Sequence, residues 1–280
     1  MIIDTHSHLN FNAFKKDLDE VIKRTLDSDI FCINVGSKYE TSKQAVEIAK
    51  KYNGMYASIG LHPMFVSAEF IKLKTDPEEG EFSVKEDVFD YKKYKELASS
   101  AGQKIVAIGE IGLDYYYKPK TKTKLEQFKE KQKQVFLQQL DLARELDLPI
   151  ILHCRMAQEG LIKILGAQVA VSYKELKGVV HCFTGGVNEL EQYLNLGFYI
   201  GLNGIIFKID LDEVIKKCPL DKILVETDCP YLTPPQEGKD KRNEPIFIKH
   251  VIQKIADLKE LSFDEVAEKT TQNAKNLFKI

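Results

Sequence analysis

Two histidines separated by a single residue stand at the start of the chain, in the segment MIIDTHSHLN. Side chains two positions apart on a β-strand point to the same face, so His6 and His8 are expected to lie together, with Asp4 behind them. Two imidazoles on one face can form a structural pair or one half of a metal site. An isolated His-x-His pattern is compatible with both, and the rest of the chain has to decide between them.

More histidines and two acidic residues follow apolar runs elsewhere in the chain. The histidines are His62 in MYASIGLH, His153 in LPIILHC and His181 in GVVHCF, and the acids are Glu110 in KIVAIGE and Asp228 in KILVETD. Imidazole and carboxylate together suit zinc, manganese or iron, and carboxylates also accept magnesium. Together with the first two histidines this set exceeds what one tetrahedral ion needs. It matches two ions that share a bridging carboxylate.

The elements that carry these residues form a regular series. Eight short apolar runs alternate with charged, helix-patterned segments: MIID, IFCINVG, MYASIGLH, KIVAIGE, LPIILHC, GVVHCF, GFYIGLNG and KILVETD. Alternation of this kind predicts right-handed crossovers and a parallel sheet, and eight repeats favour closure into a (β/α)₈ TIM barrel over residues 1–280 as a single domain. An open, doubly wound sheet is the alternative, but the chain lacks its glycine fingerprint.

A barrel changes the interpretation of the histidines. The carboxyl ends of barrel strands converge on one face, where active sites lie, and five of the six histidines would meet there. We therefore interpret His6 and His8 as metal ligands. His250 falls in a helix-patterned segment and is expected to be an ordinary surface or packing residue.

Two segments depart from the alternating pattern. Residues 66–92 are charged and contain too few apolar residues for a core of their own, so we interpret them as an insertion over the barrel rim after the third strand. After the eighth run comes the proline-rich segment PYLTPPQEGKDKRNEP. Helix-patterned segments at 246–260 and 262–280 then predict extra C-terminal helices.

Composition excludes several classes of protein. The chain has 280 residues, 44% of them hydrophobic, and a formal net charge of −2, which argues against a strongly basic nucleic-acid-binding protein. Five cysteines without a CxxC pair predict neither a zinc ribbon nor a disulfide framework. The chain has no apolar run long enough for a membrane span and no room for a signal peptide before its first strand. We expect a cytoplasmic or nuclear protein, a monomer or weak oligomer.

Neighbours of the expected ligands receive secondary interpretations. Strand alternation predicts that Cys154 and Cys182 point outward as packing residues, and that Glu226 supports the acidic ligand two positions after it. The tyrosines at 115–117 can stack on a nucleic-acid base or pack on the barrel rim. The lysine-rich segment 118–133 is either a basic rim or a solvated face of a loop and helix.

At this point the motifs resemble a known family. DTHSHL, GLHP, GEIGLDYYY, LPIILHCR, HCFTG, YIGLNG and ETDCPYLTP with KRNEP are similar to the TatD-type metal-dependent deoxyribonucleases. These belong to the amidohydrolase-like barrel superfamily. The resemblance covers essentially the whole chain in the expected order.

The resemblance implies two divalent ions, which would be Mg²⁺, Mn²⁺ or Zn²⁺. The implied ligands of one ion are His6, His8, Glu110 and Asp228, and those of the other are Glu110, His153 and His181. Residues implied near the scissile phosphate are His62, Arg155 and Asn243. The rim insertion and the linker PPQEGKD depart from the family pattern, which leaves the substrate preference and the phosphate contacts of that linker open.

The expected chemistry is hydrolysis of a phosphodiester. Two ions about 3.5–4 Å apart can clamp the attacking and leaving oxygens. We expect Asp228 to orient the nucleophilic water and accept its proton, and Arg155, two residues after His153, to contact a phosphate oxygen. His62 is expected to donate to the phosphate or to act as an acid, the alternative being a structural hydrogen bond that supports Pro63.

Three functions follow, in order of preference. The first is a metal-dependent deoxyribonuclease with DNA as substrate, acting as a 3′-exonuclease, an endonuclease or both. The second is a hydrolase of a small amide, lactone or phosphoester on the same barrel. The third is a catalytically idle binding protein, against which the complete ligand set argues.

Overall fold

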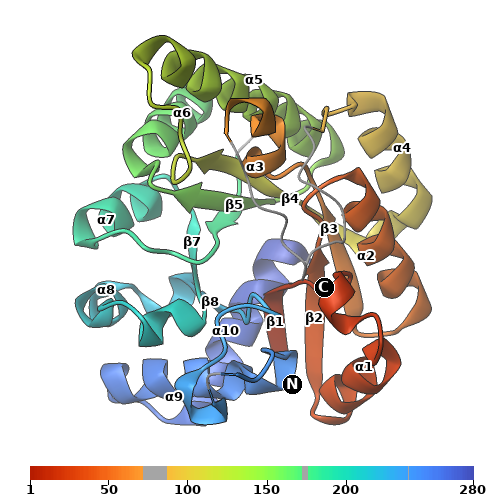
Figure 1. Ribbon diagram of the computed structural model, residues 1–280. Helices are drawn as coiled ribbons and strands as arrows, with labels where there is room; N and C mark the ends of the chain where they lie inside the picture. The colour runs from red at the N-terminus through yellow and green to blue at the C-terminus, as the bar shows by residue number, and fades with distance from the viewer. Residues whose placement is uncertain (72–86, 172–175, 239) are drawn as a thin grey trace.

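Eight parallel strands lie side by side in chain order, with helices around them (Figure 1). The computed structural model describes residues 1–71, 87–171, 176–238 and 240–280. The strands are β1 (Ile2–Ser7), β2 (Ile30–Val35), β3 (Met55–Ile59), β4 (Ile105–Asp114), β5 (Ile150–Arg155), β6 (Gly178–Val180), β7 (Tyr199–Leu202) and β8 (Ile223–Val225). Each apolar run of the sequence forms one strand, as predicted.

The first and last strands meet and close the barrel. The amide of Asp228, just past β8, donates to the carbonyl oxygen of His6 (2.8 Å), and the amide of His8 donates to that of Cys229 (2.9 Å). These bonds join segments that an open sheet would leave at separate edges, so the (β/α)₈ barrel is confirmed. The closing seam also brings residues from the two ends of the chain into one place.

The helices form the outer layer. They are α1 (Leu18–Asp27), α2 (Tyr39–Lys51), α3 (Pro63–Val66), α4 (Tyr91–Ala101), α5 (Lys122–Leu146), α6 (Gln158–Val171), α7 (Val187–Asn195), α8 (Asp212–Lys217), α9 (Ile248–Lys259) and α10 (Phe263–Phe278). The two C-terminal helices lie where the sequence predicts them. Within the part of the chain that is described, no helix has the length and apolarity needed to cross a bilayer.

Helix α5 shows how the outer layer positions the strand ends. Its buried face includes Phe128, Gln132 and Phe136, four positions apart and therefore on one stripe of the helix. The side-chain oxygen of Gln132 accepts from the amide of Asp114 (2.9 Å) at the end of β4. That of Gln139 accepts from the amide of Leu61 (2.7 Å), just after β3. Two buried glutamines thus hold two strand ends in register with the helix.

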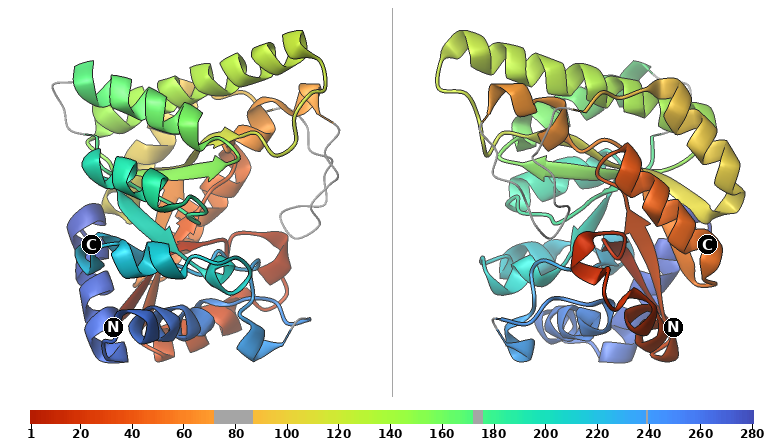
Figure 2. Two further views of the ribbon diagram at one scale, coloured as in Figure 1. Left: turned by 90° about the vertical axis from the view of Figure 1, so that its left-hand side faces the viewer. Right: turned by 45° about the vertical axis from the view of Figure 1, so that its right-hand side comes forward.

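Helix α10 packs into the amino-terminal side of the barrel. Its Leu277 and Phe278 belong to the same apolar cluster as the strand residues Ile3, Ile151 and Leu224. In the left view of Figure 2, α10 lies at one end of the strands, while the loop between β4 and α5 and the turn around α3 lie at the other. The barrel interior is therefore packed at its amino end, and an open site has to lie at its carboxyl end.

Most of the expected rim insertion, residues 72–86, lies outside the described residues. Its described flanks lie close to α3. The amide of Asp87 donates to the carbonyl oxygen of Phe65 (3.1 Å), and the buried Phe89 packs against Tyr94 with ring centroids 4.8 Å apart. The insertion therefore leaves and rejoins the barrel at its carboxyl-end rim.

Candidate metal centre

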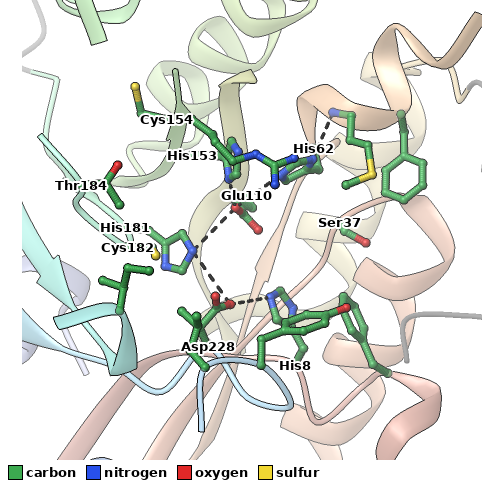
Figure 3. Close-up of a pocket in the computed structure, with 17 residues that line it drawn as sticks. His8, Ser37, His62, Glu110, His153, Cys154, His181, Cys182, Thr184 and Asp228 are labelled. Carbon is green, nitrogen blue, oxygen red and sulfur yellow. Dashed lines mark hydrogen bonds and ion pairs between the residues drawn. The ribbon is translucent and has the colours of Figure 1, made fainter. Parts of the chain in front are cut away.

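A cavity of about 380 Å³ opens at the carboxyl end of the barrel. Figure 3 shows side chains from six segments pointing into it, most of them polar at its base. The six residues predicted as metal ligands gather at this base: His6, His8, Glu110, His153, His181 and Asp228. The sixth histidine of the chain, His250, pairs instead with Glu237 (2.8 Å) on the outer surface of α9.

Strand β4 is longer than the sequence indicates. The apolar pattern predicts its end at Glu110, but the strand continues to Asp114. Gly112 makes this continuation fit: its φ is +142°, and a Cβ there would lie 2.1 Å from the carbonyl oxygen of His153. A glycine is therefore required for β4 to lie against β5. Glu110 and Asp114, an even number of residues apart, then share the inward face.

Three of the predicted residues lie past their strands rather than at the last strand position. His62 is the N-cap of α3, three residues after β3 ends, and His181 follows β6 directly. Asp228 follows β8 by three residues with a φ of +56°. A left-handed backbone is uncommon for aspartate, and here the hydrogen bond from its amide across the closing seam holds it.

The two carboxylate oxygens of Glu110 face different histidines. Its Oε2 lies 3.5 Å from His6 Nε2. Its Oε1 lies 2.6 Å from His153 Nδ1 and 3.8 Å from His181 Nε2. Glu110 is 5% exposed, so this arrangement is closed off from bulk water. A carboxylate placed between two sets of donors in this way has the geometry of a bridging ligand.

A second group of donors surrounds Asp228. Its Oδ1 lies 3.4 Å from His8 Nε2, 3.8 Å from His6 Nε2 and 3.9 Å from His181 Nε2. The Nε2 atoms of His6 and His8 are themselves 3.1 Å apart. Lone pairs and carboxylate charges that converge at such distances need a cation among them, and nitrogen–oxygen donor sets of this kind suit divalent metals. The residues present therefore fit a metal centre.

Hydrogen bonds on the outer side of two imidazoles fix which nitrogen carries the proton. His8 Nδ1 lies 2.9 Å from the carbonyl oxygen of Val35, and His181 Nδ1 lies 2.7 Å from a carboxylate oxygen of Glu226. Both acceptors require a proton on Nδ1. The Nε2 lone pair of each ring is then left pointing into the cluster, which is the arrangement found in metal-bound histidines.

His62 has the opposite arrangement. Its Nδ1 accepts a hydrogen bond from the amide of Met64 (3.0 Å), so the neutral ring carries its proton on Nε2. That Nε2 points toward Glu110 Oε1, 3.5 Å away. His62 lies within reach of Asp114 and His153 and with them resembles a third group of metal donors. Its protonated Nε2 makes it a hydrogen-bond donor instead.

The charges of the cluster compensate one another. Burial would raise the pKa of Glu110, but the surrounding histidines hold this pKa well below its usual range. Burial would lower the pKa of His181, yet the carboxylates of Glu226 and Asp228 raise it to about 10. Burial, together with His181, lowers the pKa of His6. Protons on imidazoles thus balance the buried carboxylates when no cation is present, and divalent ions can take over that role.

Behind the donors, Glu226 supports His181. This carboxylate is fully buried and also accepts from the amide of Cys182 (2.8 Å) and from the side-chain amide of Asn203 (3.0 Å). The expectation that Cys154 and Cys182 point away from the site is wrong, since both border the cavity. For Cys182 the reason is that β6 ends at Val180, so strand alternation no longer governs its direction.

Arg155 borders the cavity as expected, and it is held by a residue that sequence analysis overlooked. Its Nε and Nη2 donate to Asp114 Oδ2 (3.0 and 2.6 Å). The same oxygen lies 3.4 Å from His153 Nε2. Asp114 thus links the arginine to a metal-site histidine. Its even spacing from Glu110 within GEIGLD was the signal that could have revealed it.

Asn243 does not reach the cavity. Its side-chain nitrogen donates to the carbonyl oxygens of Thr227 (2.9 Å) and Tyr231 (2.6 Å), and its oxygen accepts from the amide of Glu244 (2.9 Å). Only 1% of it is exposed. The expectation that Asn243 contacts the substrate is therefore contradicted, because its amide is fully used in fixing the loop that carries Asp228.

Comparison with known proteins places the chain in a family. The model of the TatD related DNase family matches residues 3–279. The uncharacterized metal-dependent hydrolase YabD of Bacillus subtilis is 39% identical, with both chains covered in full, and the 3′-5′ ssDNA/RNA exonuclease TatD of Shigella flexneri is 31% identical over 100% of this chain and 99% of its own. The crystal structure of YJJV, a TatD homolog from Escherichia coli, superposes with a TM-score of 0.81 at 28% identity, covering 100% of this chain and 98% of that one. The resemblance of the sequence motifs is confirmed: the chain belongs to the TatD-related DNase family.

Proposed function

We propose that the protein is a metal-dependent hydrolase of phosphodiester bonds that removes nucleotides from the 3′ ends of single-stranded DNA. The observation that carries the proposal is the convergence of four imidazoles and two carboxylates around Glu110 at the base of one cavity. Relatives that align over their full length, including the Shigella flexneri protein, are named as 3′-5′ exonucleases of single-stranded DNA and RNA. Their names support the choice of nucleic acid over a small ester or amide.

The proposed centre holds two divalent ions. The ligands of one would be His6, His8, Asp228 and Glu110 Oε2, and those of the other His153, His181 and Glu110 Oε1. This division follows the two directions in which the Glu110 oxygens point. When bound, such ions neutralise charge on the phosphoryl oxygens and make water a stronger nucleophile.

The residues of the chain supply the remaining steps. Asp228 borders the cavity, so its carboxylate can orient a water molecule and accept its proton. His62 presents an Nε2–H that can donate to a phosphate oxygen or to the leaving oxygen. Arg155 reaches the cavity with a guanidinium already oriented by Asp114, which lowers the entropy lost when it contacts a phosphate.

The shape of the cavity supports action on a strand end. A volume of about 380 Å³ lies in the range of small-ligand sites, and the packed barrel interior closes it from below. A terminal nucleotide can enter such a cavity, whereas a continuous duplex would have to stay outside it. We therefore place exonuclease action ahead of nicking.

The test is a substrate panel at fixed salt, with Mn²⁺ or with EDTA. It contains single-stranded DNA, the same strand with a 3′ block, blunt duplex, supercoiled plasmid, RNA, a small ester and a small amide. The proposal predicts Mn²⁺-dependent shortening of the single strand that the 3′ block prevents. Plasmid nicking with no effect of the block would replace the exonuclease with an endonuclease. Turnover of the ester or amide without cleavage of any nucleic acid would overturn the proposal.

A further inference from the structure

The loop that leaves β4 beside the cavity combines exposed aromatic rings with a run of lysines. We define residues 115–124 as the β4–α5 rim. Tyr116 is 56% exposed and Tyr117 is 50% exposed. Four exposed lysines follow at alternate positions: Lys118, Lys120, Lys122 and Lys124. No acidic residue interrupts the rim, and none of these lysines forms an ion pair with another residue that the structure describes.

The backbone of this rim is anchored at its start. The amide of Tyr115 donates to the carbonyl oxygen of Arg155 (2.8 Å), and the amide of Tyr116 donates to Asp114 Oδ1 (2.9 Å). The half-buried ring of Tyr115 packs against Phe128 of α5, with centroids 6.0 Å apart. The two following rings are thus exposed on a fixed backbone, so a ligand that uses them loses little entropy in ordering the loop.

The exposed rings lie next to the cavity. Tyr116 and Tyr117 pack edge to face with centroids 4.8 Å apart. The guanidinium of Arg155, which borders the cavity, lies 4.6 Å from the centroid of the Tyr116 ring and 5.6 Å from that of Tyr117. A planar cation and two tyrosines at the edge of a phosphodiester site offer flat surfaces on which unpaired bases can stack.

We propose that the β4–α5 rim is the binding path for the part of a single strand that remains outside the cavity. Unpaired bases stack on Tyr116 and Tyr117, and phosphates farther along the strand contact the four lysines. The inference rests on the proposed function for the position of the strand end, which enters the cavity past Arg155. Because paired bases bury their faces within the duplex, the rim favours single strands and is tolerant of base sequence.

The test measures binding without requiring turnover. The Mn²⁺-loaded protein is titrated into a 5′-fluorescein phosphorothioate oligothymidylate of about 12 nucleotides, and fluorescence anisotropy is followed over a range of salt concentrations. The double variant Tyr116→Ala/Tyr117→Ala is expected to bind about tenfold more weakly and to lose the preference for the base-bearing strand over an abasic one. Tyr116→Phe/Tyr117→Phe should restore both, since stacking needs the ring and not the hydroxyl.

The lysines have a matched control. Lys118, Lys120, Lys122 and Lys124 are changed together to Gln, and the control changes the exposed residues Lys43, Lys50, Lys217 and Lys269 to Gln, with the same loss of charge. The rim variant is expected to lower the slope of log affinity against log salt by about 2 to 3, because each phosphate that a lysine neutralises on a single strand contributes about 0.7 to that slope. The control should bind like the wild type. Thermal melting confirms that all variants fold.

The outcomes separate this inference from the proposed function. Cleavage of the unmodified oligonucleotide is measured in parallel. If both rim variants bind like the wild type, or if the control loses as much affinity as the lysine variant, the path is overturned, and cleavage by the wild type still decides the function. If the wild type binds, the rim variants lose affinity and nothing is cleaved, the path is supported and the nuclease proposal fails.

Discussion

Two loops border the site and are rich in charged residues, yet they use those residues in different ways. In the loop after β8, Arg242 donates to Asp17 (2.9 and 2.7 Å) and to Glu244 (2.9 Å), and Lys241 donates to Glu237 (2.8 Å). On the β4–α5 rim, no lysine pairs with an acid among the described residues. The cations of one loop are neutralised within the chain, and those of the other are available to a ligand.

The comparison separates charge that builds the site from charge that can serve the substrate. Glu244 also accepts from Arg24 (2.7 and 2.8 Å), so the segment KRNEP ties α1 to the loop that carries Asp228. Its polar residues therefore fix the position of a metal-site carboxylate. Exposed cations with no partner in the protein are the better candidates for phosphate contacts. The following predictions test this division, from the largest effect to the smallest.

Glu110→Gln should remove activity almost completely. A neutral amide bridges two cations poorly, and the loss in kcat/KM should be at least ~10³-fold, more than the 10- to 100-fold typical for a residue behind the ligands. The barrel should keep its fold, so the melting temperature is expected to stay within a few degrees. Turnover close to that of the wild type in a folded variant would show that the bridge lies elsewhere.

Arg155→Ala should weaken turnover without releasing the ions. Loss of one charge-assisted hydrogen bond to a phosphate is worth about 1.5–3 kcal/mol, or roughly 10- to 150-fold in kcat/KM. Arg155→Lys keeps the charge but not the planar fork, and we expect it to recover only part of the loss. Elemental analysis gives the control: a variant that loses its metals would assign Arg155 to the metal centre rather than to the substrate.

Asn243→Ala should act on stability before it acts on chemistry. The change leaves the carbonyl oxygens of Thr227 and Tyr231 without a donor, at a cost of about 1–3 kcal/mol for each buried group. Urea unfolding measures the loss. The exposed Asn276→Ala on α10 serves as control and should change the free energy of unfolding by less than about 0.5 kcal/mol. A stable Asn243→Ala protein with a raised KM for DNA would return this residue to the substrate side of the comparison.

The sequence predicts those features that local pattern determines. Strand periodicity gives the eight strands, and the rule that barrel sites lie at carboxyl ends collects the histidines. Asp114 is missed because the chain passes through Gly112, whose left-handed backbone breaks the apolar pattern just where β4 continues. The partners of Arg242 cannot be read from local pattern at all, since Asp17 lies 225 positions away in the chain. Polarity is visible in a sequence, but whether a charge is already paired is decided by the closing of the barrel.

The metal content of the cluster is the most direct test of the account. Chelator-treated protein is dialysed free of chelator and titrated with Mn²⁺ in a calorimeter, and the endpoint is checked by elemental analysis. The account predicts two equivalents per chain, because the two oxygens of Glu110 face two separate sets of histidines. Saturation at one equivalent, with full hydrolytic activity at that point, would contradict the bridged two-ion centre.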